Sequence, residues 1–217
     1  MAKVLSVNVA HPRRNPADDR VVTGIDKRPV VGPVGVRAPG PMHSGQGSGL
    51  VGDTIGDQKV HGGDDQAVYA YAREDLDAWQ DRLGRDIGNG VFGENLTTTG
   101  IDVTNAVIGE RWRVGSEGLE LEVSRPRIPC RTFAAWLDIN GWIKTFTESA
   151  VPGAYLRLVR PGPVCEGDLV TVSHRPAHDV TVGLVFRALT LQPELLPEIL
   201  RADELPDPLK DVARRRS

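Results

Sequence analysis

The segment RPRIPC at residues 125–130 places one cysteine on a stiff and cationic stretch of the chain. Each proline fixes its own φ angle and pushes the preceding residue toward extended geometry, so the segment cannot continue a helix. Arg125 and Arg127 favour the thiolate form of Cys130, which attacks electrophiles or binds metal. Because one cysteine cannot build a four-ligand zinc site, a metal here must bring most of its own ligands. A nucleophilic cysteine and an inert, buried cysteine are the alternatives.

A second segment, His61-Gly62-Gly63, stands directly before two aspartates and a stretch with helical periodicity. Two adjacent glycines let the backbone approach a ligand closely with free N–H groups, so this loop is a candidate binding site. His61 could act there as a hydrogen-bond donor or a proton relay, because histidine titrates near neutral pH. The alternative is a tight turn at the start of a helix, in which His61 finds its partner locally.

A third segment, FGENLTTTG at residues 92–100, carries an acid, an amide and several hydroxyls. Asn95 and Thr97 could hydrogen-bond the polar edge of a ring-shaped ligand, since an amide offers both donors and an acceptor. Glu94 could equally orient an arginine. The alternative is a β-turn with Asn95 in the left-handed conformation, which asparagine tolerates.

These three segments, followed by PGAYLR at residues 152–157, occur in the order seen in MOSC domains. That module is named after the C-terminal part of molybdenum cofactor sulfurase. The chain resembles the stand-alone bacterial MOSC proteins of the YiiM type, from about residue 23 to a basic end at residues 214–216. Four such segments in one order are a specific signal, whereas any one of them alone would be weak.

The resemblance implies a compact β-barrel with interrupting helices, and a pterin cofactor (molybdopterin) whose dithiolene supplies the other sulfurs to molybdenum. It implies that Cys130 is the protein ligand to the metal. Cationic side chains would hold the cofactor's phosphate, because guanidinium matches phosphate bidentately, with surface ion pairing as the competing interpretation. The expected cofactor contacts are Lys27, Arg28, His61, Gly62, Gly63, Glu94, Asn95, Thr97, Arg125 and Arg127.

The activity that the resemblance implies is a molybdenum-cofactor-dependent oxidoreductase that reduces N-hydroxylated compounds such as 6-hydroxylaminopurine. Cys130 and His61 are the expected catalytic residues. The sequence carries no flavin or iron–sulfur signature, so the implied partner is a separate electron-donating reductase, a flavoprotein, besides the small-molecule substrate. One alternative is a sulfur carrier with a persulfide on Cys130, and another is a non-catalytic module that binds or stores the cofactor.

Composition sets the limits of these interpretations. The chain has 217 residues with 40% hydrophobic residues, which suffices for one buried core and a small subdomain. A formal net charge of -3 argues against nucleic acid and anionic membrane as partners. Because no segment approaches the roughly 20 apolar residues of a membrane span and the start lacks a signal-peptide core, we expect a cytoplasmic protein. Two cysteines make a structural disulfide improbable, and a homodimer is an open option.

Short β-like segments between glycines and prolines predict a mainly β fold, a barrel or sandwich. The expected strands are residues 3–9, 20–23, 33–37, 110–114, 119–124, 155–159 and 169–173. A helix is expected over residues 66–83, with Val68, Tyr71 and Trp79 on one stripe. Helical segments at 132–137 and 142–149 would place Cys130 near a helix N-terminus, where a thiolate is favoured.

The residue pattern changes from strand-like to helix-like near residue 173. Three helical segments are predicted after it, at residues 180–189, 193–201 and 209–214. We therefore predict a β-barrel domain over residues 1–173 and a three-helix subdomain over residues 174–217. The proline- and glycine-rich run at residues 38–49 resembles an insertion, and its composition predicts a mobile loop. His43 within it could gate a pocket or be a solvated loop histidine.

Overall fold

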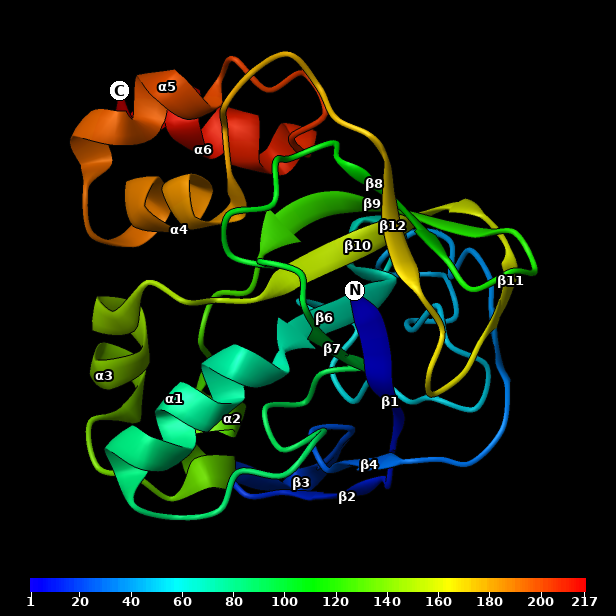
Figure 1. Ribbon diagram of the computed structural model, residues 1–217. Coiled ribbons are helices and arrows are strands. Elements are labelled where there is room, and N and C mark those ends of the chain that lie inside the picture. The colour runs from blue at the N-terminus through cyan, green and yellow to red at the C-terminus, as the bar shows by residue number, and fades with distance from the viewer.

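The computed structural model describes the whole chain, residues 1–217. Figure 1 shows the strands gathered on one side and the helices in two groups on the other. The strands are β1 (Lys3–Ala10), β2 (Arg13–Asn15), β3 (Asp18–Thr23), β4 (Lys27–Pro29), β5 (Val34–Val36), β6 (Val68–Ala72), β7 (Leu96–Thr99), β8 (Arg111–Val114), β9 (Leu119–Pro126), β10 (Ala154–Arg160), β11 (Gly162–Val164) and β12 (Val170–His174). The helices are α1 (Arg73–Leu83), α2 (Arg131–Leu137), α3 (Trp142–Ser149), α4 (Val182–Thr190), α5 (Leu196–Ile199) and α6 (Asp207–Arg216), with 3₁₀ turns η1 (Asp64–Gln66) and η2 (Pro193–Leu195).

One eight-stranded sheet, in the order β12-β8-β9-β10-β6-β7-β1-β4, forms the centre of the molecule. It is antiparallel except between β6 and β7, which run parallel. The sheet curls until the amide of Val4 donates to the carbonyl of Asp168 at 2.8 Å. It does not close into the expected barrel, because only an isolated bridge between Lys3 and Leu169, and no regular ladder, joins β1 to the start of β12. The mainly β class is confirmed, and the closed barrel is corrected to an open, curled sheet.

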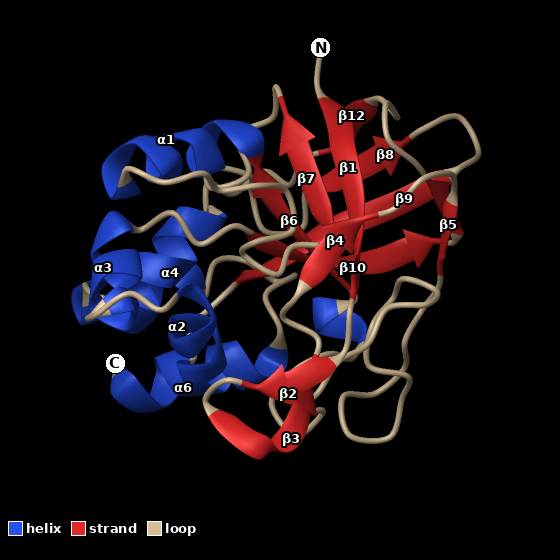
Figure 2. Cartoon of the chain, turned by 90° about the horizontal axis from the view of Figure 1, so that it is seen from below, coloured by secondary structure: helices blue, strands red, loops and turns tan.

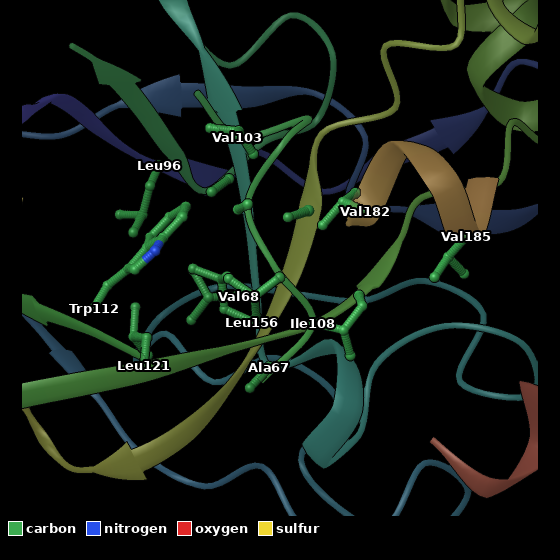
Figure 3. Close-up of a cluster of buried hydrophobic side chains, with 14 of the residues drawn as sticks. Ala67, Val68, Leu96, Val103, Ile108, Trp112, Leu121, Leu156, Val182 and Val185 are labelled. Carbon is green, nitrogen blue, oxygen red and sulfur yellow. The ribbon is translucent and has the colours of Figure 1, made fainter. Parts of the chain in front are cut away.

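The main hydrophobic core lies inside this curl and continues into the C-terminal helices. Figure 3 shows Leu96, Trp112 and Leu121 from the sheet in the same cluster as Val182 and Val185 from α4. Burial of apolar side chains in one shared cluster stabilises the sheet and the helices together. The predicted boundary after residue 173 falls one residue before the end of β12. The division into two domains stays a prediction.

A second cluster of aromatic side chains packs α1, α2 and α3 against β6. Phe133 of α2 contacts Trp142 and Phe146 of α3, with ring centroids 5.5 Å and 5.2 Å apart. Edge-to-face pairs of this kind add to the burial of large rings. The cluster therefore fixes the start of α2, and with it the segment that carries Cys130. Helices at 132–137 and 142–149 are confirmed, and so are helical segments in the tail.

The predicted helix over residues 66–83 is wrong in its first half. Residues 68–72 form β6, in the middle of the sheet between β10 and β7, and α1 begins at Arg73. All five residues of β6 are buried, so this strand lacks the polar alternation of a half-exposed one. An apolar run of this length matches a helical stripe by coincidence, because periodicity alone cannot separate the two.

The proline- and glycine-rich run at residues 38–49 is held more firmly than its composition suggested. The carbonyl of Gly47 accepts from the amide of Gly63 at 2.9 Å, and the amide of Gly49 donates to Ala67 at 2.8 Å. The end of the run is buried, whereas His43 is exposed and does not line the cavity that contains Cys130. None of the helices is long and apolar enough to cross a membrane.

Candidate functional site

Cys130 lines a cavity of about 610 Å³, which we call the Cys130 cavity. Its walls come from the β2–β3 hairpin, the loop over residues 54–62 and the connection from β9 to α2. Its volume lies within the range of small-molecule sites, roughly 300–1,000 Å³. Among the expected site residues, those that line the cavity are Lys27, His61, Gly62, Asn95, Arg127 and Cys130. Those that do not are Arg28, Gly63, Glu94, Thr97 and Arg125.

The thiol of Cys130 is poised to ionise. Cys130 is the N-cap residue of α2, and its carbonyl accepts from the amide of Ala134 at 3.1 Å. Burial alone would raise the pKa of the thiol, but the neighbouring imidazole of His61 and the charge of Arg127 lower it to about 6. A backbone hydrogen bond from Phe133 acts in the same direction. The thiolate therefore predominates at neutral pH, as expected from the sequence.

Arg127 places a buried positive charge beside this thiolate. The residue is 5% exposed, and its guanidinium lies over the ring of Phe133, 3.9 Å from the centroid. One nitrogen donates to the carbonyl of Phe92, while no carboxylate lies within ion-pair distance. Buried charges are normally paired, so an arginine without an acid at a cavity wall marks a place where an anion would be stabilised.

His61 and Gly62 of the HGG loop line the cavity, and Gly62 and Gly63 also pack against the rest of the protein. His61 lines the cavity and influences Cys130. Gly62 and Gly63 have φ angles of 83° and 81°. A Cβ atom on Gly62 would lie 2.7 Å from the carbonyl oxygen of Gly47, so this glycine is required by the loop over residues 38–49. The structural interpretation of this loop therefore applies to its glycines, and a contact from His61 to a ligand stays a prediction.

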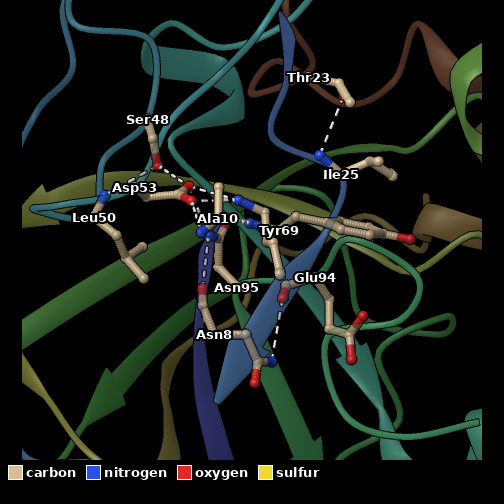
Figure 4. Close-up of polar contacts among 11 residues, drawn as sticks. Asn8, Ala10, Thr23, Ile25, Ser48, Leu50, Asp53, Tyr69, Glu94 and Asn95 are labelled. Atoms are coloured by element: carbon tan, nitrogen blue, oxygen red, sulfur yellow. Dashed lines mark hydrogen bonds and ion pairs between the residues drawn. The ribbon is translucent and has the colours of Figure 1, made fainter. Parts of the chain in front are cut away.

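Below the cavity, Lys27, Ser48, Asp53 and Asn95 form a buried polar cluster, which we call the Asp53 network (Figure 4). The ammonium of Lys27 lies 2.6 Å from both oxygens of Asp53. Asp53 also accepts from Ser48 at 2.6 Å, from Asn95 at 2.9 Å and from the amide of Ala10 at 2.7 Å. Burial raises the pKa of Asp53, yet Lys27 and these donors leave it below its ordinary value.

Asn95 lines the cavity, but its amide is already committed to the protein. Its oxygen accepts from the backbone of Tyr69 at 3.1 Å. Its nitrogen donates to Asp53 and, at 3.3 Å, to the carbonyl of Asn8. These contacts satisfy the acceptor and both donors of the side chain. The structure thus gives Asn95 a positioning role, since it ties β6 to the Asp53 network.

Glu94 and Thr97 lie behind the cavity and fasten the loop over residues 90–93. Burial raises the pKa of Glu94, whose carboxylate accepts from the amides of Gly90 and Phe92 and from the hydroxyl of Thr97. Because the carbonyl of Phe92 in turn accepts from Arg127, Glu94 orients that arginine indirectly. The option that Glu94 orients an arginine therefore has a structural counterpart, through the backbone.

The remaining two arginines stand apart from the cavity. Arg28 is exposed and pairs with Asp26 at 2.9 Å, which matches the surface ion-pair alternative. Arg125 lies on β9 opposite Tyr155, and its buried Nε atom has no hydrogen-bond partner. Neither side chain reaches the lining.

Comparisons with known proteins identify the family. The MOSC domain matches residues 57–171, a stretch that includes the HGG loop, the FGENLTTTG segment and Cys130. This chain belongs to the MOSC domain family. It is 35% identical over 138 residues to the protein YiiM of Escherichia coli, covering 62% of this chain and 60% of YiiM. It is 30% identical over 185 residues to YflK of Bacillus subtilis, covering 85% and 79%.

A relative from Gibberella moniliformis named "Reductase" is 27% identical over 218 residues, which cover 98% of this chain and 37% of the relative. Among solved structures, YiiM from Geobacillus stearothermophilus has a TM-score of 0.78 at 23% identity, with 100% of this chain and 99% of that one covered. YiiM from Escherichia coli has a TM-score of 0.74, covering 100% and 92%. The fold agrees over the full chain, and the expected YiiM type of MOSC protein is confirmed.

The cavity of this MOSC protein also contains residues that the motifs did not single out. Tyr155 and Tyr69 line it with ring centroids 5.0 Å apart. The hydroxyl of Tyr69 donates to the carbonyl of Pro152 at 2.8 Å, whereas that of Tyr155 has no partner in the protein. Burial raises the pKa of Tyr155. The sequence contained a signal for Tyr155, which lies in the PGAYLR segment. Its position beside Arg125, however, follows only from the register of β9 and β10.

The donor set fits a metal that arrives with its own ligands. Nowhere in the chain do three or more histidine, cysteine or acidic side chains come together in a group that could hold a metal ion. Cys130 offers one soft thiolate, which suits a metal held mainly by other sulfurs. The unpaired charge of Arg127 suits an anionic group on the same ligand. A dithiolene-bearing, phosphorylated pterin has both features.

Proposed function

We propose that this MOSC protein is a molybdenum-cofactor-dependent reductase of N-hydroxylated compounds. The observation that carries the proposal is the thiolate of Cys130, held beside the unpaired guanidinium of Arg127 on a cavity of about 610 Å³. The family and the name of the Gibberella relative support a redox function. When bound, the cofactor supplies a redox-active metal that exchanges electrons with the substrate.

The chain's own residues would hold and shield that group. Cys130 is the protein ligand, and Arg127 stabilises negative charge beside it. Lys27 is bound to Asp53 and contributes through the Asp53 network, which keeps the cavity floor in place. Phe133 and Tyr69 stack on Arg127 and exclude water from its faces, so the local charge interactions are strengthened.

The reaction also requires protons. Converting an N-hydroxylated amine to the amine and water consumes two electrons and two protons and breaks the N–O bond. Two residues that line the cavity, His61 and Tyr155, carry exchangeable protons and interact electrostatically with Cys130. We assign proton delivery to His61, because histidine exchanges protons readily near neutral pH. We assign the supply of electrons to a separate flavoprotein reductase, because the sequence carries no flavin or iron–sulfur signature.

Activity is tested with protein produced in a cofactor-synthesising host, assayed anaerobically with a chemical reductant and 6-hydroxylaminopurine. The proposal predicts adenine as product. His61→Ala should lower kcat by roughly 10²–10⁴-fold while metal content stays near that of the wild type, the usual loss for a general acid–base group. If metal and activity fall together, His61 only shapes the loop.

The two alternatives leave different signatures in the same experiment. A sulfur carrier would show a persulfide on Cys130 by mass spectrometry, without stoichiometric molybdenum, because a lowered pKa also favours sulfur transfer. A storage module would hold stoichiometric cofactor and reduce no N-hydroxylated base, amidine or hydroxamate. Either result would replace the reductase proposal.

A further inference from the structure

Three exposed valines line the Cys130 cavity. Val21, Val22 and Val60 are 46%, 51% and 57% exposed, although side chains of this kind are usually buried. Val21 and Val22 belong to β3, and Val60 belongs to the loop that leads to His61. Apolar side chains from two separate segments thus line one opening, which we call the mouth of the cavity.

The two segments of the mouth are fixed against each other. A Cβ atom on Gly24 would collide with the carbonyl oxygen of Thr54, and one on Gly56 with that of Val22. Asn15 on the hairpin also donates to the hydroxyl of Thr132, two residues after Cys130, at 2.9 Å. Figure 2 shows the β2–β3 hairpin standing outside the main sheet beside the long loops. The two segments are therefore held in place, and the valines of the mouth offer apolar contact to a ligand.

Two exposed cations complete the mouth. Lys59 and Arg131 line the cavity, and neither has a carboxylate within ion-pair distance. Asp57 is the one acid in the lining, and its carboxylate accepts from the backbone amide of Lys59 at 3.0 Å. Arg131 helps to lower the pKa of Asp18, but that carboxylate is already bound by Arg20 at 2.8 Å. Both cations remain free to bind an anionic group.

We propose that the mouth binds a flat heteroaromatic ring that carries an anionic group, so that the preferred substrate is an N-hydroxylated nucleotide and not the free base. The ring lies between the valines, and the phosphate contacts Lys59 and Arg131. Charge-assisted contacts to phosphate are strong and directional for arginine. This inference rests on the proposed reductase function for its reaction, but its binding part can be measured separately.

Substrate preference is measured first, on holo-protein with a chemical reductant. We expect kcat/KM for the 5′-monophosphate ribonucleotide of 6-hydroxylaminopurine to exceed that for the base by about tenfold. The variant Lys59→Gln/Arg131→Gln should bring this ratio close to one, mainly through KM of the nucleotide. The control Lys144→Gln/Arg215→Gln removes two exposed charges away from the cavity and should keep the ratio. Equal kcat/KM for base and nucleotide in the wild type would overturn the proposal.

AMP has no N-hydroxyl group and so is not a substrate. Its binding then shows whether Lys59 and Arg131 bind the phosphate of a nucleotide or that of the cofactor. Calorimetry should show AMP binding to both apo- and holo-protein, weakened by Val22→Asp and unchanged by Val31→Asp, whose valine is fully exposed outside the cavity. Binding to the apo-protein alone would assign the cations to the cofactor's own phosphate and overturn the proposal. If AMP binds holo-protein through Lys59 and Arg131 but nothing is reduced, the ligand class stands and the reductase function fails.

Discussion

We divide the polar residues at the Cys130 cavity into two groups, called the lower layer and the upper layer, which differ in how their hydrogen bonds are used. In the lower layer, Lys27, Asp53 and Asn95 bond to one another and to the backbone. In the upper layer, Arg127 has no acid partner, and the hydroxyl of Tyr155 has no partner in the protein. Asn95, Arg127 and Tyr155 come from the motif segments of the sequence, whereas Lys27 and Asp53 lie outside them.

The difference separates positioning from binding. A buried polar group costs free energy unless it is satisfied, so a satisfied network such as the Asp53 network rigidifies the cavity floor. A buried cation that has no carboxylate partner and faces only the thiolate of Cys130 is stabilised further when a ligand provides an anionic group. Substitutions in the lower layer should therefore act on stability, and substitutions in the upper layer on the ligand and on thiol chemistry. The following predictions test that division.

The largest effect on stability is expected at Asp53. Asp53→Ala leaves Lys27 buried without its partner, so the free energy of unfolding should fall by about 3–5 kcal/mol in urea denaturation. The double variant Lys27→Met/Asp53→Leu removes both charges and should recover much of this loss. If Asp53→Ala unfolds at the same urea concentration as the wild type, the lower layer is not a structural network.

A smaller loss is expected at Asn95. Asn95→Ala removes the acceptor of the Tyr69 amide and one donor to Asp53, which should cost about 1–3 kcal/mol of unfolding free energy. The variant should still retain cofactor in proportion to its folded fraction. Loss of cofactor at unchanged stability would move Asn95 into the upper layer and revive its predicted role as a ligand contact.

Arg127 should act on the thiol. The pKa of Cys130 is lowered to about 6, so alkylation of the apo-protein by iodoacetamide should rise with pH around that value. Arg127→Met removes one of the causes and should move the midpoint upward by about one unit. The measurement is the alkylation rate against pH, with Cys165→Ala as background so that only Cys130 reacts. An unchanged midpoint would show that the charge of Arg127 does not reach the thiolate.

The two layers also show how much of the fold and of the candidate site could be predicted from the sequence. The cationic cysteine segment, the helix after it and the mainly β class follow from local rules for proline, charge and alternation. Which of the polar motif residues face the cavity does not, because this depends on strands that pair across the chain. Asn95 and Glu94 are neighbours in sequence. The side-chain partners of Asn95 are 26 to 87 residues away along the chain, whereas those of Glu94 are two to four residues away.

The same limit explains the element that the sequence misplaced. The sequence predicts a helix at β6 because its buried residues match a helical stripe, whereas its burial on both faces is set by β7 and β10. Composition likewise says nothing of the hydrogen bonds that join the loop at residues 38–49 to Gly63 and Ala67. In both cases the contacts with distant segments could not be derived from the local sequence.

Asp75, a carboxylate away from the cavity, gives a smaller test of the principle that a buried polar group without a partner costs free energy. Burial raises the pKa of Asp75 to about 6, helped by the charges of Asp102 and Glu74, and the side chain has no hydrogen-bond partner. The folded state thus binds this proton more tightly than the unfolded chain, so stability is lost as pH rises from about 4 to above 6. Asp75→Asn should therefore raise the unfolding free energy at pH 8 by about 0.5–1 kcal/mol, allowing for solvent screening and the lost helix-dipole contact.

The pH dependence is the check on this prediction. Thermal unfolding of the wild type and Asp75→Asn should differ at pH 8 and converge at pH 4, where the carboxyl group is protonated. A constant difference at both pH values would mean that packing, and not ionisation, separates the two proteins.

The central claim is that Cys130 holds a molybdenum cofactor, and metal content tests it most directly. Wild type, Cys130→Ala and Cys165→Ala are produced side by side in a cofactor-synthesising host, and molybdenum and pterin are measured per folded protein. Cys165 lies away from the cavity, so its variant should match the wild type. We predict near-stoichiometric molybdenum in both of these and a loss of molybdenum in Cys130→Ala at unchanged stability. Equal molybdenum in all three proteins, or none in the wild type, would contradict the account.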